Sequence, residues 1–301
     1  GEFDQHTGLF YSGFEVENEV TAMESPTAVI IGTGPLALGN GAASDYCTAG
    51  VIATLKSAGF HTVVIDNNPS SVTLSPVFAD RRYIEPLTTD DVVDVVENEH
   101  PAVIVLPTMR HDLQQKLAAM DLPHCKIVSL PFEARPKGVS NDDFIVAINF
   151  IHDGNDFYPL ATTAALHNSA TDQYMNTDLR SPAEISDDDR DRLQVLGRGA
   201  AGQIPQSGLY QLWCVRKQGR LEPLTIQPIP TTDLAFLSKV LGINLAGIAL
   251  QLATDNFRAS TLPNWLGVRQ PDEYAIYHAR YPFRELHLVG EEPTAAKVIG
   301  G

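Results

Sequence analysis

The residues with the clearest potential for binding chemistry form a glycine-rich loop, GTGPLALGNGAASDYC, from Gly32 to Cys47. The loop follows an apolar run at 28–31 and precedes a segment, 48–59, that has the character of a helix. Glycines between a strand and a helix let the backbone come close to a bound anion. The helix start adds unpaired N–H groups and the positive end of the helix dipole. Because many strand-to-helix turns are rich in glycine, the pattern alone indicates only a candidate binding cleft. The candidate residues in the loop are Gly32, Gly34, Gly39, Gly41 and Asp45.

Two more polar residues are candidates for the same cleft. Asn67 and Asn68 follow the second expected strand, at the carboxyl edge where α/β sheets bind ligands. The proline after them fits an Asx-type turn equally well, so both interpretations stand. For Asp45 we favour a helix cap over a ligand contact.

Two different alternation patterns indicate two domains that position these residues. In the first part, short runs rich in Val and Ile alternate with helical stretches, which is typical of a parallel sheet with helices on both faces. The expected strands are 27–32, 61–65, 102–106 and 126–130, and the expected helices are 44–58, 89–98 and 111–120.

The second part has strands in sequence-neighbour pairs joined by turns, which indicates an antiparallel α+β unit. Its expected strands are 144–151, 156–164, 208–216 and 221–227, and helices at 184–198, 233–241 and 244–254 are expected to cover one face. The acidic run EISDDDRD predicts a helix start with Ser186 as N-cap and acidic residues facing the helix dipole.

The glycine loop and several later segments together resemble the carbamoyl-phosphate synthetase large subunit, in the second of its two homologous synthetase halves. That family writes G-x-G-P-x-x-I-G-Q-x-x-E-F-D-Y-C, then N-P-E-T-V-S-T-D and D-R-L-Y-F-E-P. The corresponding segments here are NPSSVTLS at 68–75 and DRRYIEP at 80–86. GLFYSGFE at 8–15 is similar to the family's linker before that half, and FLSK at 236–239 to its F-V-S-K. The resemblance also makes His167 a candidate for the cleft, because it stands at the His of the family's A-G-V-H-S-G-D-S. Since the polar neighbours of that His are replaced here, we favour a packed or surface side chain over a ligand.

The resemblance implies a fold: a Rossmann-like pre-ATP-grasp parallel sheet, followed by a reduced ATP-grasp-like α+β domain. It places a linker or N-terminal arm at 1–24, the first domain at 25–135 and the second at 140–301. The boundary falls in 131–141, where two prolines and a glycine interrupt regular structure.

The departures from the family pattern concern the catalytic apparatus. The positions that the resemblance assigns to metal ligands, Gln, Glu and Asn, hold Trp213, Thr225 and Gln227. Mg²⁺ prefers hard oxygen ligands, which Trp lacks, and phosphoryl transfer depends on positioned metal and charge. The family also inserts a nucleotide-covering subdomain where this chain has only 131–143, which is too short for a lid. We therefore expect no catalytic residues, no metal and no cofactor.

Three hypotheses follow from the resemblance. The first, which we favour, is an inactive relative retained as a binding, structural or regulatory protein, with a small anion in the cleft. The second is residual ATP-dependent ligase activity using ATP and Mg²⁺, completed by a partner subunit. It needs carboxylates such as Glu222 or Asp233, and strand alternation separates Glu222 from the face of Thr225. The third is an interaction module that self-associates or docks on a synthetase-type subunit.

Bulk composition supports a cytoplasmic protein. The formal net charge of -16 argues against nucleic acid or an anionic membrane as partner, because phosphate binding needs clustered Lys and Arg. No apolar run reaches the length of a membrane span. The three cysteines are widely spaced, which suits reduced thiols rather than a disulfide framework or a cysteine metal site.

Overall fold

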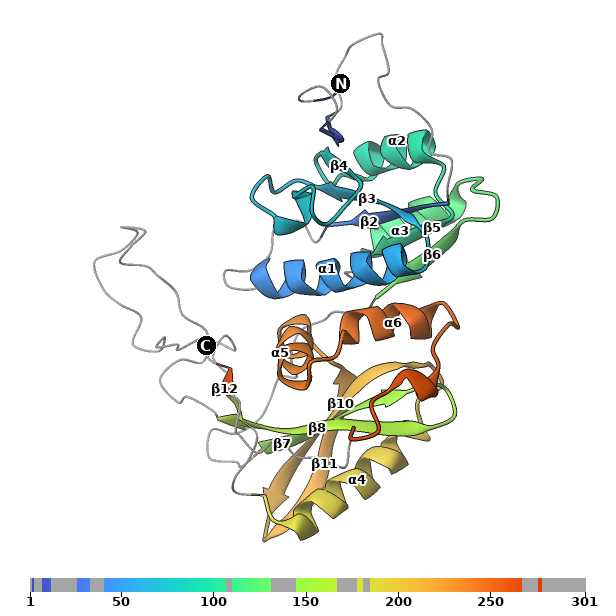
Figure 1. Cartoon of the computed structure of the whole chain (residues 1–301). Helices are drawn as coiled ribbons and strands as arrows, with labels where there is room; N and C mark the ends of the chain where they lie inside the picture. The colour runs from blue at the N-terminus through green and yellow to red at the C-terminus, as the bar shows by residue number, and fades with distance from the viewer. Residues whose placement is uncertain are drawn as a thin grey trace, which may run out of the picture. The chain divides into compact units, whose positions relative to one another are not determined.

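The structure is a computed structural model that describes residues 2, 7–11, 26–32, 41–106, 110–130, 145–166, 178–180, 185–266 and 276–277. The chain divides into two compact units. Unit 1 comprises residues 1–133 and 242–256, and unit 2 comprises 134–241 and 257–301. Each unit combines one sheet with helices, as the sequence predicted (Figure 1).

Unit 1 is built on a six-stranded parallel sheet with the order β1-β4-β3-β2-β5-β6. Its strands are β1 (Leu9–Phe10), β2 (Thr27–Ile31), β3 (His61–Asp66), β4 (Arg81–Ile84), β5 (Val103–Leu106) and β6 (Lys126–Ser129). Every residue of β2 is buried, as expected for a strand covered on both faces. The strand order reverses between β2 and β5. Open α/β sheets bind ligands at such a switch point, beyond the carboxyl ends of the strands.

Helices cover both faces of this sheet (Figure 1). One face carries α1 (Gly41–Ser57), which packs on β2 and β3. The other face carries α2 (Thr89–Glu99) and α3 (His111–Ala119), whose apolar side chains join those of the strands in one core cluster. A short 3₁₀ helix, η1 (Val72–Leu74), follows β3.

Two segments join unit 1 that the sequence assigned elsewhere. The helix α6 (Leu245–Ala253), expected in the second domain, packs on α1. Asn244 explains this, because its Nδ2 donates to the Gly50 carbonyl at 2.8 Å while its Oδ1 caps α6 at the Gly247 N–H. The segment 1–24, expected to be an arm or linker, contributes the edge strand β1. Local sequence did not predict these long-range contacts.

Unit 2 is built on a six-stranded antiparallel sheet with the order β11-β10-β7-β8-β9-β12. Its strands are β7 (Ile145–His152), β8 (Phe157–Leu166), β9 (Asp178–Arg180), β10 (Gly208–Lys217), β11 (Arg220–Pro228) and β12 (Ile276–Tyr277). Both expected hairpin turns are present. Gly154, Gln218 and Gly219 adopt positive φ there, as tight hairpins require.

The helices of unit 2 lie on opposite faces of its sheet, so the prediction that they cover one face is wrong (Figure 1). α4 (Asp187–Ala201) packs on Val146, Ile148 and Phe150. α5 (Thr231–Leu241) faces the alternate residues of the same strand. Because β7 is buried along its whole length, both of its faces need a cover.

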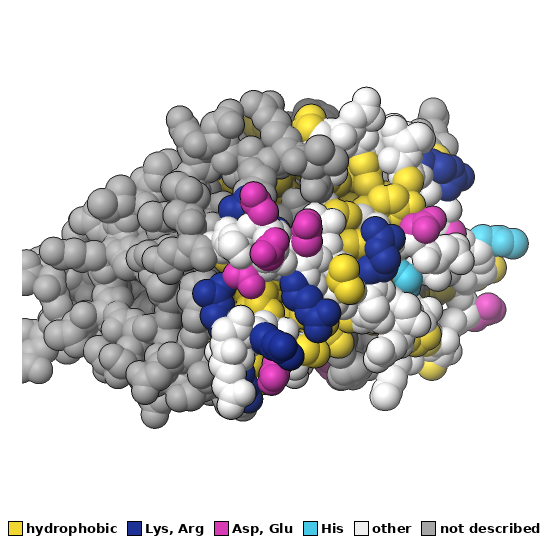
Figure 2. All heavy atoms as spheres, turned by 90° about the horizontal axis from the view of Figure 1, so that it is seen from below, with side chains coloured by type: hydrophobic (Ala, Val, Ile, Leu, Met, Phe, Trp, Pro, Cys, Tyr) yellow, Lys and Arg dark blue, Asp and Glu magenta, His cyan; other side chains and the backbone are white. Residues whose placement is uncertain are grey.

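The N-terminus of α4 has the predicted cap, since the Asp189 N–H donates to Ser186 Oγ at 3.2 Å. Three aspartates occupy the first turn of the helix. Figure 2 views the molecule from the side on which α4 lies, and acidic and basic side chains intermingle there with hydrophobic ones. The three aspartates are therefore best explained as solvated side chains that interact favourably with the positive end of the helix dipole.

Candidate functional site

The first candidate site is the carboxyl edge of the unit 1 sheet, beside the switch point. Gly32 directly follows β2, and its N–H donates to the Ile65 carbonyl at 2.7 Å. A Cβ at Gly32 would lie 2.6 Å from Cγ of Asp66, so only glycine fits beside that carboxylate. This packing accounts for the glycine without a ligand. Gly34, Gly39 and His167 lie outside the described residues, and Gly41 is the first residue of α1.

Asp45 connects α1 to the loop that follows β3. Its Oδ1 accepts from Ser71 Oγ at 2.9 Å, and its Oδ2 accepts from the Val72 N–H at 3.1 Å. The prediction that Asp45 caps its own helix is wrong, because α1 already begins at Gly41 and Asp45 lies inside it. The side chain instead holds a neighbouring loop in place.

Asp66 and the two asparagines after it form the turn that the proline suggested. Asp66 Oδ1 accepts from the Asn68 N–H at 3.0 Å, and Asn68 Oδ1 accepts from the Ser70 N–H at 3.1 Å. These are Asx-turn hydrogen bonds. A ligand contact by Asn67 or Asn68 stays a prediction.

Two acidic side chains lie at the described part of this edge. Burial raises the pKa of Asp66, and the charge of Asp45 acts in the same direction, while hydrogen bonds from Asn68 and Ser71 oppose the rise. Two carboxyl groups therefore lie close enough to repel each other at the described part of the edge.

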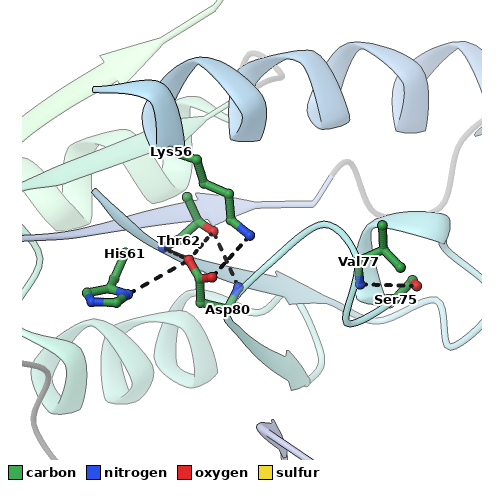
Figure 3. Close-up of polar contacts among 6 residues, drawn as sticks. All are labelled: Lys56, His61, Thr62, Ser75, Val77 and Asp80. Carbon is green, nitrogen blue, oxygen red and sulfur yellow. Dashed lines mark hydrogen bonds and ion pairs between the residues drawn. The ribbon is translucent and has the colours of Figure 1, made fainter. Parts of the chain in front are cut away.

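The amino edge of the same sheet is held by Asp80, the first residue of the DRRYIEP segment (Figure 3). Asp80 Oδ2 accepts from both the N–H and the hydroxyl of Thr62 at 2.9 Å, and Lys56 Nζ lies 3.0 Å from Oδ1. Burial alone would raise the pKa of Asp80, but these hydrogen bonds outweigh it and lower the pKa. Asp80 therefore has a structural role, away from the edge where ligands bind.

The second candidate site is a row of polar side chains in unit 2. Gln211 on β10 lies opposite Asn149 on β7 and Gln227 on β11. Gln211 Nε2 donates to Asn149 Oδ1 at 3.1 Å, and Gln227 Nε2 donates to Gln211 Oε1 at 3.2 Å. Asn149 in turn donates to Thr163 Oγ1 at 3.1 Å. Three amides and the Thr163 hydroxyl thus form one hydrogen-bonded chain across neighbouring strands, buried except at Gln227.

Asp233 at the start of α5 closes this chain with a carboxylate. Gln211 Nε2 also donates to Asp233 Oδ2 at 3.1 Å, and Thr232 Oγ1 donates to Oδ1 at 3.3 Å. Asn149, Gln211 and Asp233 have no exposed surface. Sequence reasoning missed this network as a unit. Gln227 and Asp233 were named separately, and Asn149 and Gln211 within apolar strands were the further signal, because burial of a polar side chain requires a partner.

Trp213 and Thr225, the positions assigned to metal ligands by resemblance, are cross-strand partners. Trp213 is 3% exposed and packs with Ile145, Ala147 and Phe236. Among the described residues, its indole Nε1 has no hydrogen-bond partner. An indole offers no oxygen to a cation and Thr225 offers one neutral oxygen, so this pair does not fit Mg²⁺.

The strand β11 contains a bulge that changes where its side chains lie. Trp213 pairs with Thr225, but the next pair is Cys214 with Pro223, which leaves one extra residue in β11. Glu222 pairs with Val215 and therefore lies on the same face as Thr225. The expectation from simple alternation that Glu222 lies off this face is wrong. Its side chain is exposed.

Among the described residues, no group of three or more His, Cys, Asp or Glu side chains could hold a metal ion. Within the same residues, no single helix is long and apolar enough to cross a membrane. α5 and α6 meet that criterion only when they are taken together as a bent pair.

Comparison with known proteins assigns the first domain. Residues 24–122 match the carbamoyl phosphate synthase preATP-grasp domain. The chain is 38% identical over 134 residues to a carbamoyl phosphate synthase large chain of Thermus thermophilus, which covers 44% of this chain and 13% of that one. It is 40% identical over 105 residues to the large chain of Deinococcus radiodurans, covering 35% and 10%. The matched region is a small part of the length of these relatives.

Similarity of fold extends over more of the chain. The biotin carboxylase domain of a single-chain bacterial carboxylase superposes with a TM-score of 0.59 at 10% identity, over 84% of this chain and 74% of that one. The urea carboxylase of Kluyveromyces lactis gives a TM-score of 0.56 at 11% identity, over 79% and 22%. Identities this low show the fold alone, which is a parallel sheet with helices joined to a separate antiparallel α+β unit, as the sequence predicted.

Proposed function

We propose, from the premise that residues 24–122 form a carbamoyl phosphate synthase preATP-grasp domain, that this chain is a synthase-like protein without ligase activity. On this proposal it acts as a binding or regulatory protein, through a second copy or a synthetase-type partner. The family resemblance supplies ATP-dependent ligation as the ancestral chemistry. The inference of inactivity comes from the residues that occupy the ancestral site.

The observation that carries the proposal is the pairing of Trp213 with Thr225. A large, buried indole stands where a hard oxygen ligand is expected, and it packs against Phe236 of α5. Next to it, the oxygen of Gln211 accepts from Gln227. Binding Mg²⁺ there would require expelling the indole and breaking this amide chain, and each change costs folding free energy.

The test is calorimetry of the purified chain with ATP and Mg²⁺, with phosphate release measured in parallel. We expect no saturable heat below millimolar ATP and no phosphate release above the background measured with excess EDTA. Saturable, Mg²⁺-dependent ATP binding would contradict the proposal. If the heats are flat, partners are tested next, by light scattering for a second copy and by titration with a synthetase subunit.

A residual ligase is the second candidate, and the β-bulge favours it because Glu222 lies on the face of Thr225. If the chain binds ATP with Mg²⁺, this candidate predicts that Glu222→Gln and Asp233→Asn each abolish binding. Glu97→Gln, an exposed change on α2 of unit 1, is the matched control and leaves binding unchanged. Loss of binding in the control as well would exclude a rebuilt site at these carboxylates.

A further inference from the structure

The edge of the unit 1 sheet is completed by a strand of only two residues. Leu9 and Phe10 form β1 and pair in parallel with Arg82 and Tyr83 of β4. The Arg82 N–H donates to the Gly8 carbonyl at 2.8 Å, which extends the pairing by one residue. This geometry is strand addition, in which an extended peptide completes a sheet edge through main-chain hydrogen bonds.

Phe10 is the anchor of this segment. It is 6% exposed, its ring centroid lies 5.5 Å from that of Tyr83, and the Arg81 guanidinium lies 5.5 Å above the ring. Arg81 and Tyr83 are both fixed by the buried carboxylate of Glu99 on α2. Arg81 Nη1 donates to its two oxygens at 2.8 and 2.9 Å, and the Tyr83 hydroxyl donates at 2.5 Å. The pocket for Phe10 is therefore held in shape by contacts that Phe10 does not make.

Arg82 binds the main chain of the segment. Its side chain is buried, its Nη2 donates to the Thr7 carbonyl, and its Nη1 donates to the Leu74 carbonyl at 3.0 Å. No carboxylate is paired with this guanidinium within the described residues. Arg82 therefore selects an extended backbone rather than a particular side chain.

Gly8 gives the segment its second sequence requirement. It has φ +66°, in the left-handed region, and a Cβ there would lie 3.1 Å from the Asp80 carbonyl oxygen. A side chain at this position is disfavoured by the backbone conformation and by the close approach. The contacts thus specify glycine, then any residue, then an aromatic ring.

We propose that the β4 edge, with Arg81, Arg82, Tyr83 and Glu99, is a docking groove for an extended peptide of the pattern Gly-x-Phe. The chain's own residues 7–11 fill the groove as a displaceable occupant. Displacement is feasible because β1 has two residues and Leu9 is only half-buried, whereas β2 has five residues, all buried. Short edge elements of this kind open locally without global unfolding. This inference stands independently of the proposed function.

Peptide exchange tests the proposal in the full chain. Gly8→Val loosens the chain's own segment and leaves every groove residue intact. Gly59→Val is the matched control, because Gly59 also has positive φ (+87°) but lies in open space. The probe is a fluorescein-labelled peptide of residues 5–14, compared with the same peptide carrying Phe10→Ala.

We expect the Gly8→Val protein to bind the native peptide saturably and at least about tenfold more tightly than the Phe10→Ala peptide. The wild-type and Gly59→Val proteins should bind the native peptide at least about tenfold more weakly than Gly8→Val does. The proposal fails if a Gly8→Val protein with a native circular dichroism spectrum binds neither peptide, or binds both equally. It also fails if the Gly59→Val control binds the native peptide as tightly as Gly8→Val does.

Hydrogen exchange in the wild-type chain is a second test that needs no variant. The amides of Leu9, Phe10 and Tyr11 should exchange at least about a hundredfold faster than those of Val29 and Ile30 in β2, and their rates should be insensitive to low urea. Exchange of both groups at one rate would show that the segment opens only with the whole unit. That result would overturn displacement.

Discussion

Replacing Glu99 by alanine should destabilise unit 1 by about 4 kcal/mol. Glu99 is buried and holds Arg81 through both carboxylate oxygens, and Arg81 is itself 8% exposed. Removing one partner of a buried ion pair costs about 3–5 kcal/mol, because the remaining charge loses the bidentate contact that offset its burial. The Tyr83 hydroxyl also loses its acceptor, which adds about 1 kcal/mol. Contact of Arg81 with the Phe10 ring offsets part of this loss.

The assay must report unit 1 alone, because a chain of two units need not unfold in one step. Both tryptophans, Trp213 and Trp265, belong to unit 2, so fluorescence reports the wrong unit. Hydrogen exchange followed by mass spectrometry across a urea series, on peptides that cover β3, gives the opening free energy of the unit 1 core.

Two variants make this result decisive. Glu97→Ala changes an exposed carboxylate on the same helix and should cost less than about 0.5 kcal/mol. The double variant Arg81→Met, Glu99→Leu removes both charges and should recover more than half of the loss, since a buried pair is often replaceable by apolar side chains. A loss below about 1 kcal/mol in Glu99→Ala would refute the reasoning, as would a double variant less stable than the single one.

Two further predictions concern other sites. The Arg110 guanidinium lowers the pKa of Asp112 to about 2. Because the folded-state pKa is depressed, this contact stabilises the fold fully above about pH 4, and the stabilisation is lost as the pH falls through about 2. Arg110→Gln should return the pKa of the Asp112 carboxyl to its ordinary range, which an NMR titration would measure. Gln211→Leu should destabilise unit 2 by about 2–4 kcal/mol, because Asp233 and Asn149 lose a buried hydrogen-bond donor. The urea midpoint of unfolding, followed by tryptophan fluorescence, should therefore fall. An unchanged midpoint would show that the network contributes no net stability.

The parts of the fold that sequence predicted are those set by local pattern. Short runs of Val and Ile indicated the strands of unit 1, since a parallel sheet buries both faces of its strands. Turn residues such as Gly154 and Gly219 indicated the hairpins of unit 2, because few residues tolerate positive φ. Ser186 indicated the start of α4. In each case the determining interaction lies within a few residues of the signal.

The parts that sequence did not predict depend on contacts between distant segments. Asn244 places α6 on α1 through a hydrogen bond to a residue 194 positions away. Phe10 joins the core of unit 1 beside Tyr83 of β4, which is also distant from it in the sequence. The bulge in β11, which moves Glu222 onto the face of Thr225, results from pairing with β10. No periodicity along the chain carries this information.

The candidate site shows the same division, and it bears on function. Asp45 and Asn68 were identifiable from the sequence as polar residues of the cleft, but their side chains accept hydrogen bonds from the protein's own backbone and side chains. In unit 2, the amides of Gln211 and Gln227 likewise bind each other. A site prepared for a charged ligand keeps donors or acceptors free to meet it, whereas these groups are already paired. A ligand there would have to displace satisfied hydrogen bonds in a buried setting, where each lost bond costs about 1–3 kcal/mol. The groups of the β4 groove are paired as well, with residues 7–11, but their partner there is an edge strand of two residues, and Glu99 holds the Phe10 pocket in shape without contacting that strand.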